Sequence, residues 1–395
     1  MLSNEPAPAL HWPSRFNEIP KEVFHREDIF ELEIERIFLG PDWHMVAHGS
    51  ELPKPGDYKT FTLGNMPILV LRGDDNVIRV FENACTHRGV QLATCSRGHA
   101  KASLQCPYHR WNFNLRGNLI GAPGISEFGA DFRKENFGLR ALRSGEYLGI
   151  VFVTASDETP ELGEWLDDTA PYVAKALNGD GKLRFLGYQK ALFDTNWKAY
   201  SDNEGYHGPL LHAALRLLQF PRAEGVQFMT RGAHKVNSSH YPGVPRTGFL
   251  NDYSLLETRD EQAVPQNTVI SLFPVSIIVR NMDTLTLRYA FPIGPDQTEV
   301  HYAYFGHEKD DEELMRHRVR QGSNLAGPSG FITLEDGAVF NRLQTGLHSR
   351  GNVAFQKGVK SADPFEAPCD LDKGDEAGNL IRWERYRKMM GFVRD

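Results

Sequence analysis

The chain has 395 residues, of which 41% are hydrophobic and 24% are charged, as in a globular protein long enough for two or three domains. Its formal net charge of −7 argues against a nucleic-acid binder that relies on phosphate attraction. No apolar run of about 18 residues predicts a membrane span, and the N-terminus lacks a signal-peptide pattern. Four cysteines are too few for a disulfide scaffold and suggest metal or catalytic use.

The predicted elements begin with an amphipathic helix over 26–38, in which apolar and acidic residues are interspersed. From 42 to about 155, short β-branched and aromatic runs are separated by turn residues. These runs predict hairpins over 57–83 and 111–123 and a strand over 146–154. We therefore expect a small all-β module in this part of the chain.

A polar stretch with Pro and Gly at 155–166 is the best candidate for a linker. After it, helices are predicted over 211–220 and 334–347, and strands over 267–281 and 283–293. The mixture indicates an α+β region that contains an antiparallel sheet.

Two pairs of metal-binding residue types lie in the β module. CTHRG contains Cys85 and His87, and CPYHRW contains Cys106 and His109. Two Cys and two His also form a tetrahedral zinc set, but a zinc finger pairs Cys with Cys and His with His, whereas each loop here carries one of each. The mixed loops suit a Rieske-type [2Fe–2S] cluster, in which one iron takes both thiolates and the other both imidazoles. Cys95 fits neither loop and is expected to be a small buried residue.

A second group of candidate ligands lies in DNEGYHGPLLH (202–212), where His207 and His212 are five residues apart. Residues at this spacing do not share a face of a straight helix. Pro209 disfavours continuation of a helix that precedes it and favours the start of another. A bend between the two histidines could therefore aim both imidazoles at one point, although both could also be polar core residues.

A metal held by two imidazoles needs a third ligand, and a carboxylate would complete the 2-His-1-carboxylate set of non-haem iron oxygenases. The stretch GFITLEDGAVFNRLQ (330–344) offers Glu335 and Asp336 near the start of a predicted helix. The competing interpretation is a charged first turn that complements the helix dipole.

These motifs together, with NWK ahead of N-E-G-Y-H-x₄-H, resemble the large (α) subunit of Rieske non-haem iron ring-hydroxylating oxygenases over nearly the whole chain. The chain looks most similar to the aromatic-acid branch, the terephthalate- and salicylate-type oxygenases. The resemblance implies two cofactors, a [2Fe–2S] Rieske cluster and a mononuclear Fe(II). It implies these ligands: Cys85, His87, Cys106 and His109 for the cluster, and His207, His212 and Asp336, the second acid of its pair, for the iron.

The resemblance also implies the domain organisation of an α+β chain. A small all-β Rieske domain at 42–155 is expected to be inserted near the N-terminus, behind a helical segment at 1–41 that packs with the catalytic domain. The catalytic domain is expected at 156–395, with an antiparallel sheet surrounded by helices.

As an activity, the resemblance implies a terminal oxygenase that uses O₂ to hydroxylate an aromatic compound, in this branch an aromatic acid, by cis-dihydroxylation or monohydroxylation. No G-x-G-x-x-G fingerprint is visible, so electrons are expected from a separate NAD(P)H-dependent flavin reductase, with or without a ferredoxin. A homotrimer of α subunits in the bacterial cytoplasm is expected, with or without a small β subunit, and without nucleic-acid or membrane partners. The alternatives are a Rieske monooxygenase that demethylates or oxidises a quaternary amine, and an electron-transfer Rieske protein without mononuclear iron.

Two further positions are candidates for functional roles. Family members commonly carry Asp three residues before the first iron histidine, where it couples the two metal centres across a subunit boundary. Here Glu204 stands at that place, in a segment that looks shorter than usual, and Asp202 is the competing residue. A Glu resembles the branch that oxidises quaternary amines. Arg288, in the predicted strand 283–293, could pair with a substrate carboxylate or could be a solvent-facing strand residue.

Overall fold

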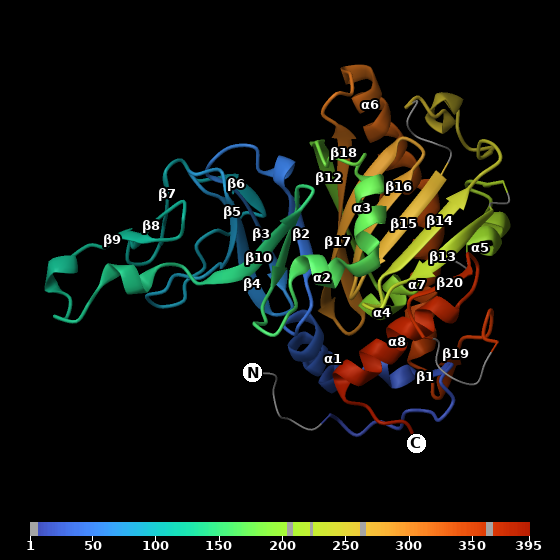
Figure 1. Ribbon diagram of the computed structural model, residues 1–395, viewed down its shortest axis with the longest axis horizontal. Helices are drawn as coiled ribbons and strands as arrows, with labels where there is room; N and C mark the ends of the chain where they lie inside the picture. The colour runs from blue at the N-terminus through green and yellow to red at the C-terminus, as the bar shows by residue number, and fades with distance from the viewer. Residues whose placement is uncertain (1–6, 204–207, 222–223, 261–265, 361–365) are drawn as a thin grey trace. The chain divides into compact units, whose positions relative to one another are not determined.

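The computed structural model describes two compact units of the chain (Figure 1). The first unit comprises Met1–Ile37 and Gly163–Asp395, and the second comprises Phe38–Leu162. The boundaries predicted from the sequence are 41/42 and 155/156. The residues that the structure describes are 7–203, 208–221, 224–260, 266–360 and 366–395.

The unit Phe38–Leu162 is built mainly from antiparallel strands, as the all-β prediction required. Its larger sheet has the order β2-β11-β10-β5-β4-β3-β6, and its smaller sheet has the order β7-β8-β9. The strands of the larger sheet are β2 (His44–His48), β3 (Asp57–Leu63), β4 (Met66–Arg72), β5 (Ile78–Glu82), β6 (Arg97–His99), β10 (Ala141–Tyr147) and β11 (Ile150–Thr154). The strands of the smaller sheet are β7 (Ser103–Gln105), β8 (Asn112–Asn114) and β9 (Leu119–Gly121).

The predicted hairpins over 57–83 and 111–123 are confirmed by β3–β4–β5 and by β8–β9. The single strand predicted over 146–154 is wrong, because the chain reverses between β10 and β11. Tyr147 pairs with Ile150, and Leu148 and Gly149 both have positive φ. Two consecutive residues of positive φ form the tight turn that suits strand twist, and Leu-Gly is a weak signal for it.

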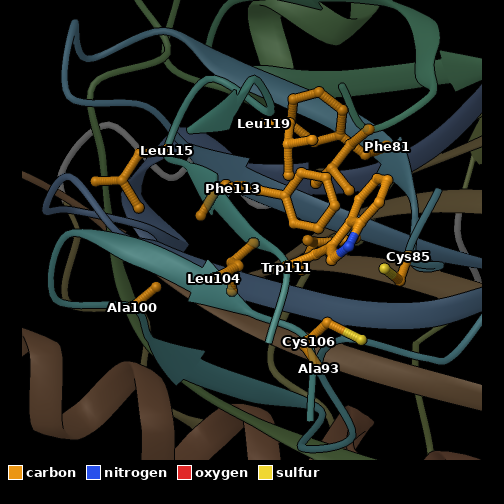
Figure 2. Close-up of a cluster of buried hydrophobic side chains, with 13 residues drawn as sticks. Phe81, Cys85, Ala93, Ala100, Leu104, Cys106, Trp111, Phe113, Leu115 and Leu119 are labelled. Atoms are coloured by element: carbon orange, nitrogen blue, oxygen red, sulfur yellow. The ribbon is translucent and has the colours of Figure 1, made fainter. Parts of the chain in front are cut away.

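Two clusters of buried side chains stabilise this unit. One is aliphatic and includes Val46, Ile68 and Val151. The other is aromatic and includes the side chains drawn in Figure 2, which shows Cys85 and Cys106 together at one side of it, beside Trp111. Cys95 is exposed, so the expectation that it is buried is wrong.

The larger unit is organised around one antiparallel sheet of eight strands in the order β12-β18-β17-β16-β15-β14-β13-β20. Its strands are β12 (Leu183–Phe193), β13 (Glu224–Met229), β14 (Lys235–His240), β15 (Gln266–Leu272), β16 (Ser276–Asn281), β17 (Thr284–Gly294), β18 (Gln297–His307) and β20 (Cys369–Asp372). The strand predicted over 267–281 is in fact the hairpin β15–β16, because Pro274 cannot donate to the ladder and lies in the turn. A separate pair joins β1 (Glu18–Pro20) to β19 (Asn352–Ala354).

Helices surround this sheet, as predicted. They are α1 (Glu27–Glu33), α2 (Leu162–Leu166), α3 (Ala170–Ala176), α4 (Trp197–Ser201), α5 (Gly208–Leu215), α6 (Glu312–Gln321), α7 (Phe331–Leu347) and α8 (Ala377–Met390). The helix predicted over 211–220 ends early, at Leu215, because Arg216 is left-handed with φ 63°. None of the described helices is long and apolar enough to cross a membrane.

A buried carboxylate fastens α1 to the rest of the larger unit. Glu33 accepts hydrogen bonds from Trp197 Nε1 at 2.7 Å, Lys198 Nζ at 2.6 Å and Tyr386 Oη at 2.5 Å. An ion pair buried this deeply costs desolvation, which the added neutral donors offset. The N-terminal helix is thereby tied to α4 and α8.

Candidate metal centres

The two Cys/His loops of the smaller unit are closed by equivalent backbone hydrogen bonds. Cys85 N donates to Val90 O at 2.8 Å, and Cys106 N donates to Trp111 O at 2.7 Å, so each cysteine bonds to the residue five positions later. The first loop connects β5 to β6, and the second connects β7 to β8. Both loops are therefore tight turns whose backbone fixes the direction of the Cys and His side chains.

The fourth residue after each cysteine has a left-handed backbone: Gly89 with φ 74° and Arg110 with φ 60°. Glycine adopts this conformation without strain, which explains the Gly of CTHRG, whereas Arg110 adopts it at some cost. The two loops thus share one backbone path even though their sequences differ at this position.

The four predicted cluster ligands come together by type. The thiols of Cys85 and Cys106 are buried and interact with each other. The rings of His87 and His109 lie 4.8 Å apart, centroid to centroid. Burial raises the pKa of the Cys85 thiol, while the backbone N–H groups of His87 and Arg88 act in the opposite direction. N–H groups aimed at a ligand sulfur also tune the potential of an iron–sulfur cluster.

Aromatic rings cover both histidines, one inside the unit and one at its surface. Trp111 stacks on His87 at 4.6 Å with an interplanar angle of 6° and is itself buried. Tyr108 stacks on His109 at 3.7 Å and is 55% exposed, with the guanidinium of Arg88 over its ring at 5.6 Å. The two covering rings therefore differ in exposure, although His87 itself is exposed and His109 is half-buried.

This donor set fits a [2Fe–2S] cluster better than a single ion. Among the described residues, no three His, Cys, Asp or Glu side chains gather around one point. A two-iron cluster requires only two protein ligands at each iron, and it separates thiolates from imidazoles as observed here. A tetrahedral zinc ion would need all four side chains around one centre.

The second centre is built by α5 and α7. His212, on α5, is 7% exposed, and its Nδ1 donates to the carboxylate of Glu335 on α7. The other oxygen of Glu335 accepts from Leu217 N at 2.7 Å. A carboxylate on Nδ1 fixes the tautomer and orientation of an imidazole and leaves Nε2 for a metal.

Asp336 follows Glu335 on α7 and is half-buried. Its charge acts on Arg288 and on Tyr302, which places it close to both side chains. Of the predicted iron ligands, the structure therefore gives positions for His212 and Asp336. His207 and the predicted bridge Glu204 lie outside the described residues.

Asp202, the competing bridge residue, is described and is engaged within its own unit. Helix α4 ends at Ser201, and the Asp202 carboxylate accepts from Trp383 Nε1 of α8 at 2.7 Å. Its backbone carbonyl accepts from Asn379 Nδ2 at 3.0 Å. Burial raises the pKa of Asp202 to about 6, against the opposing effects of Lys235 and its other neighbours.

Arg288 lies on β17 and is half-buried rather than solvent-facing. Its guanidinium lies over the ring of Tyr302 at 4.7 Å, and Nη2 donates to Ala326 O at 3.4 Å. Burial alone would lower the pKa of Arg288, but Tyr302, Tyr200 and Asp336 raise it. The side chain thus lies near α7, the helix that carries Asp336.

Sequence reasoning missed two residues of this region and one contact of a third. Glu335 was considered as a ligand or a helix-dipole charge, not as the partner of His212 Nδ1. Tyr200 and Tyr302 were not singled out, because they lie on a helix and a strand far apart in sequence. Only the fold brings them to Arg288, and no local pattern marks them.

Two family models match this chain. The Rieske [2Fe–2S] domain matches residues 42–138, and the ring-hydroxylating α subunit (catalytic domain) matches residues 166–370. These matches assign the [2Fe–2S] cluster to the smaller unit and a mononuclear iron to the larger one.

Individual relatives agree with these models. The chain is 30% identical to the anthranilate 1,2-dioxygenase large subunit of Burkholderia cepacia, over 99% of this chain and 97% of the relative. It is 31% identical to the salicylate 5-hydroxylase large oxygenase component of a Ralstonia species, over 86% and 87%. Naphthalene 1,2-dioxygenase with bound indole has the same fold, with a TM-score of 0.82 at 21% identity over 97% and 94% of the chains. The chain belongs to the family of Rieske ring-hydroxylating oxygenase α subunits.

Proposed function

We propose that this protein is the terminal oxygenase that hydroxylates an aromatic acid with O₂. The relatives named above act on anthranilate and salicylate, and another, 29% identical over 97% of this chain, is a terephthalate 1,2-dioxygenase subunit. The overall reaction consumes O₂, two electrons and two protons. It gives either a cis-dihydrodiol or a hydroxylated product and water. The mononuclear iron, when bound, supplies the activation of O₂.

The observation that carries this proposal is the pairing of His212 with Glu335 next to Asp336. Because the Glu335 carboxylate already accepts hydrogen bonds from His212 and from Leu217 N, Asp336 is the better candidate for the carboxylate ligand. A plain electron-transfer protein has no need for a buried imidazole oriented in this way. His207 completes the proposed ligand set from a segment outside the described residues.

Electrons are proposed to come from NAD(P)H through a separate flavin reductase, with or without a ferredoxin, in the cytoplasm where NAD(P)H is available. We keep Glu204 as the proposed bridge between the centres, because the Asp202 carboxylate is already engaged with Trp383. Transfer between neighbouring subunits requires a closed head-to-tail ring, for which a homotrimer is proposed. The proposal allows for a small β subunit in addition to the α subunits of this ring.

Iron counting on the holoenzyme tests the proposal. A cluster and one mononuclear iron give about three irons per chain, whereas an electron carrier gives about two. We expect His212→Ala to lose about one iron and all hydroxylation while it retains the Rieske absorption and EPR signals. His240→Ala, which changes an exposed histidine of β14, is the matched control and should keep all three. Two irons in the unchanged protein would refute the proposal.

A second candidate is oxidation of a quaternary amine. The chain is 30% identical to a carnitine monooxygenase oxygenase subunit of Acinetobacter pittii, over 84% of this chain. Glu204 at the proposed bridge position also fits that branch. Product analysis with aromatic acids and quaternary amines, each supplied with O₂ and a reductase, separates the two: hydroxylation of an amine alone would favour this second function.

A further inference from the structure

Buried arginines of the larger unit differ in how their charge is neutralised. Arg280, on β16, donates to Asp260 at 3.1 Å, and Arg318, on α6, donates to Asp260 at 2.7 Å and to Asp310 at 2.8 Å. Each therefore has a carboxylate partner, as a guanidinium removed from water requires.

Within the part of the chain that the structure describes, Arg288 has no such partner. Among the described residues it forms no ion pair, and its one hydrogen bond to the backbone is the 3.4 Å contact with Ala326 O. Its Nε is buried and meets no acceptor within the described ranges. A guanidinium has five N–H donors in a planar fork, and apart from Ala326 O and the Tyr200 side chain no group of the described chain accepts from it, so donors remain for a ligand.

Strand register places Arg288 on the face of the sheet that looks toward the iron-binding helices. Arg288 is directly opposite Ile277 on one side and Tyr302 on the other. Because side chains alternate along a strand, Arg280 lies on the opposite face, where its Nη1 reaches Ala176 O of α3 at 3.5 Å. Unlike Arg280, Arg288 thus lies on the face of the sheet that looks toward the iron-binding helices.

Two tyrosines hold the guanidinium of Arg288 in place without neutralising its charge. The ring of Tyr302 lies under it at 4.7 Å, and Tyr200 of α4 interacts with both side chains. Tyr200 also packs on Phe340 of α7 at 5.6 Å, one turn after Asp336. Tyr304, on the same face, is different, because its hydroxyl donates to Gln189 at 2.6 Å.

Resting on the function proposed above, we propose that Arg288 is the anion-binding residue of the substrate site and takes the carboxylate of an aromatic acid. A planar guanidinium matches a carboxylate through two parallel N–H···O bonds, which a lysine ammonium cannot reproduce. Tyr302 fixes the plane of the fork from below, and Tyr200 and Tyr302 supply hydroxyls beside it. The carboxylate of Asp336 also lies near Arg288. When Asp336 is a metal ligand, its negative charge is shared with the metal ion.

If Arg288 has this role, the charge of the substrate decides how tightly it binds. The carboxylate sets the orientation of the ring, because it is held at a fixed residue of the sheet. A neutral amide of the same shape loses the charge-assisted bonds, and a cation is repelled. Such bonds in a buried site change affinity by about one to two orders of magnitude.

The experiment measures binding of benzoate, anthranilate, salicylate and terephthalate, and of their amides, to the holoenzyme by titration calorimetry. The variants are Arg288→Gln, Arg288→Lys and Tyr302→Phe. Lys190→Gln removes a cation from the solvent-exposed edge strand β12 and is the matched control. Iron content, cluster absorption and thermal unfolding establish that each variant has folded and is loaded.

We expect at least one of these acids to bind about tenfold or more tightly than its amide, and this preference to disappear in Arg288→Gln. Arg288→Lys should recover only part of it, Tyr302→Phe should reduce it by a smaller factor, and Lys190→Gln should leave it unchanged. An unchanged preference in folded Arg288→Gln, or equal binding of acid and amide by the unchanged enzyme, overturns the inference. The proposed function survives those results if the enzyme still holds three irons and hydroxylates an aromatic substrate, and it fails separately if only two irons are present.

Discussion

The cluster loops and the iron site hold metal ligands in two different ways. The four cluster ligands lie between Cys85 and His109, on two loops that the same backbone hydrogen bond closes. The proposed iron ligands are spread from His207 to Asp336, and their geometry depends on the packing of α5 against α7. Local backbone structure is sufficient for the first centre, whereas the second exists only once the larger unit has folded.

This difference follows from what each centre must do. A cluster only transfers electrons, and rigid turns with N–H groups near the sulfur keep its geometry constant. An oxygenase iron needs open positions for O₂ and space for a substrate, so its ligands come from elements that surround a site. Glu335, which orients His212 from another helix, performs the task that the loop backbone performs for the cluster.

The largest expected effect comes from removing one cluster ligand. Cys106→Ala should abolish the Rieske absorption and EPR signals and lower the iron content from about three to about one per chain, since a thiolate lost from one iron leaves the cluster incomplete. The remaining iron should stay in the larger unit. Cys95→Ala changes an exposed cysteine and should leave the iron content unchanged. Retention of three irons in Cys106→Ala would contradict the ligand assignment.

A smaller effect is expected when the support of the iron site is weakened without removing a ligand. Glu335→Gln can still accept from Leu217 N but binds His212 Nδ1 without a charge. We expect iron affinity to fall about 10- to 100-fold, with the cluster spectrum unchanged. Iron content after dialysis against graded chelator concentrations measures this. Glu313→Gln, at an exposed position of α6, is the control, and equal losses in both variants would show that Glu335 has no special role.

The contrast between the centres also explains what the sequence could predict. The spacing of CTHRG and CPYHRW was enough to propose all four cluster ligands, because both loops are short and their geometry is local. The fold class and most hairpins followed from strand periodicity and turn residues. The turns at Leu148-Gly149 and around Pro274 were missed, since the first has no strong turn signal and the second lies within an apolar run.

The iron site could be predicted only in part. His212 and Asp336 were identified from family motifs. The bond from His212 to Glu335, and the group formed by Tyr200, Arg288 and Tyr302, arise from contacts between elements separated by tens to more than a hundred residues. No spacing rule connects such residues, because their proximity is a property of the sheet register and the helix packing.

An intermediate effect is expected from Asp202, which packs against α8 near the iron-binding segment. Its pKa is raised to about 6 by burial, opposed by Lys235, Trp383, Arg382 and Lys198. A carboxyl with a raised pKa contributes stability below its unfolded pKa and loses that contribution as pH rises through about 6. Asp202→Asn should therefore gain stability relative to the unchanged protein between pH 5 and pH 8, by roughly 1–1.5 kcal/mol in the free energy of unfolding, because about one pKa unit of the shift lies in this window.

Denaturant unfolding of both proteins at the two pH values measures this change. Asp252→Asn is the control of opposite sign, because hydrogen bonds from Ser254 and the nearby Arg320 lower the pKa of Asp252 to about 2. Its contribution should be constant between pH 5 and pH 8 and be lost only in stronger acid. A pH-independent difference between the unchanged protein and Asp202→Asn would show that the Asp202 carboxyl is already ionised at pH 5.

The smallest effect separates the two aromatic rings within the cluster unit. Trp111 stacks on His87 inside the core and is 3% exposed, whereas Tyr108 stacks on His109 and is 55% exposed. Tyr108→Ala should change the free energy of unfolding by less than about 1 kcal/mol, as at most surface positions. Trp111→Ala creates a cavity and should cost about 3–5 kcal/mol.

Thermal unfolding followed through the cluster absorption compares these two variants directly. Similar losses in both would mean that Tyr108 is held as firmly as a core residue, and that the two loops are equivalent in packing as well as in backbone. Different losses leave His109 as the ligand whose cover is easily displaced. His87 itself is exposed and His109 is half-buried, so the two rings that cover them differ in packing while both histidines remain near the surface.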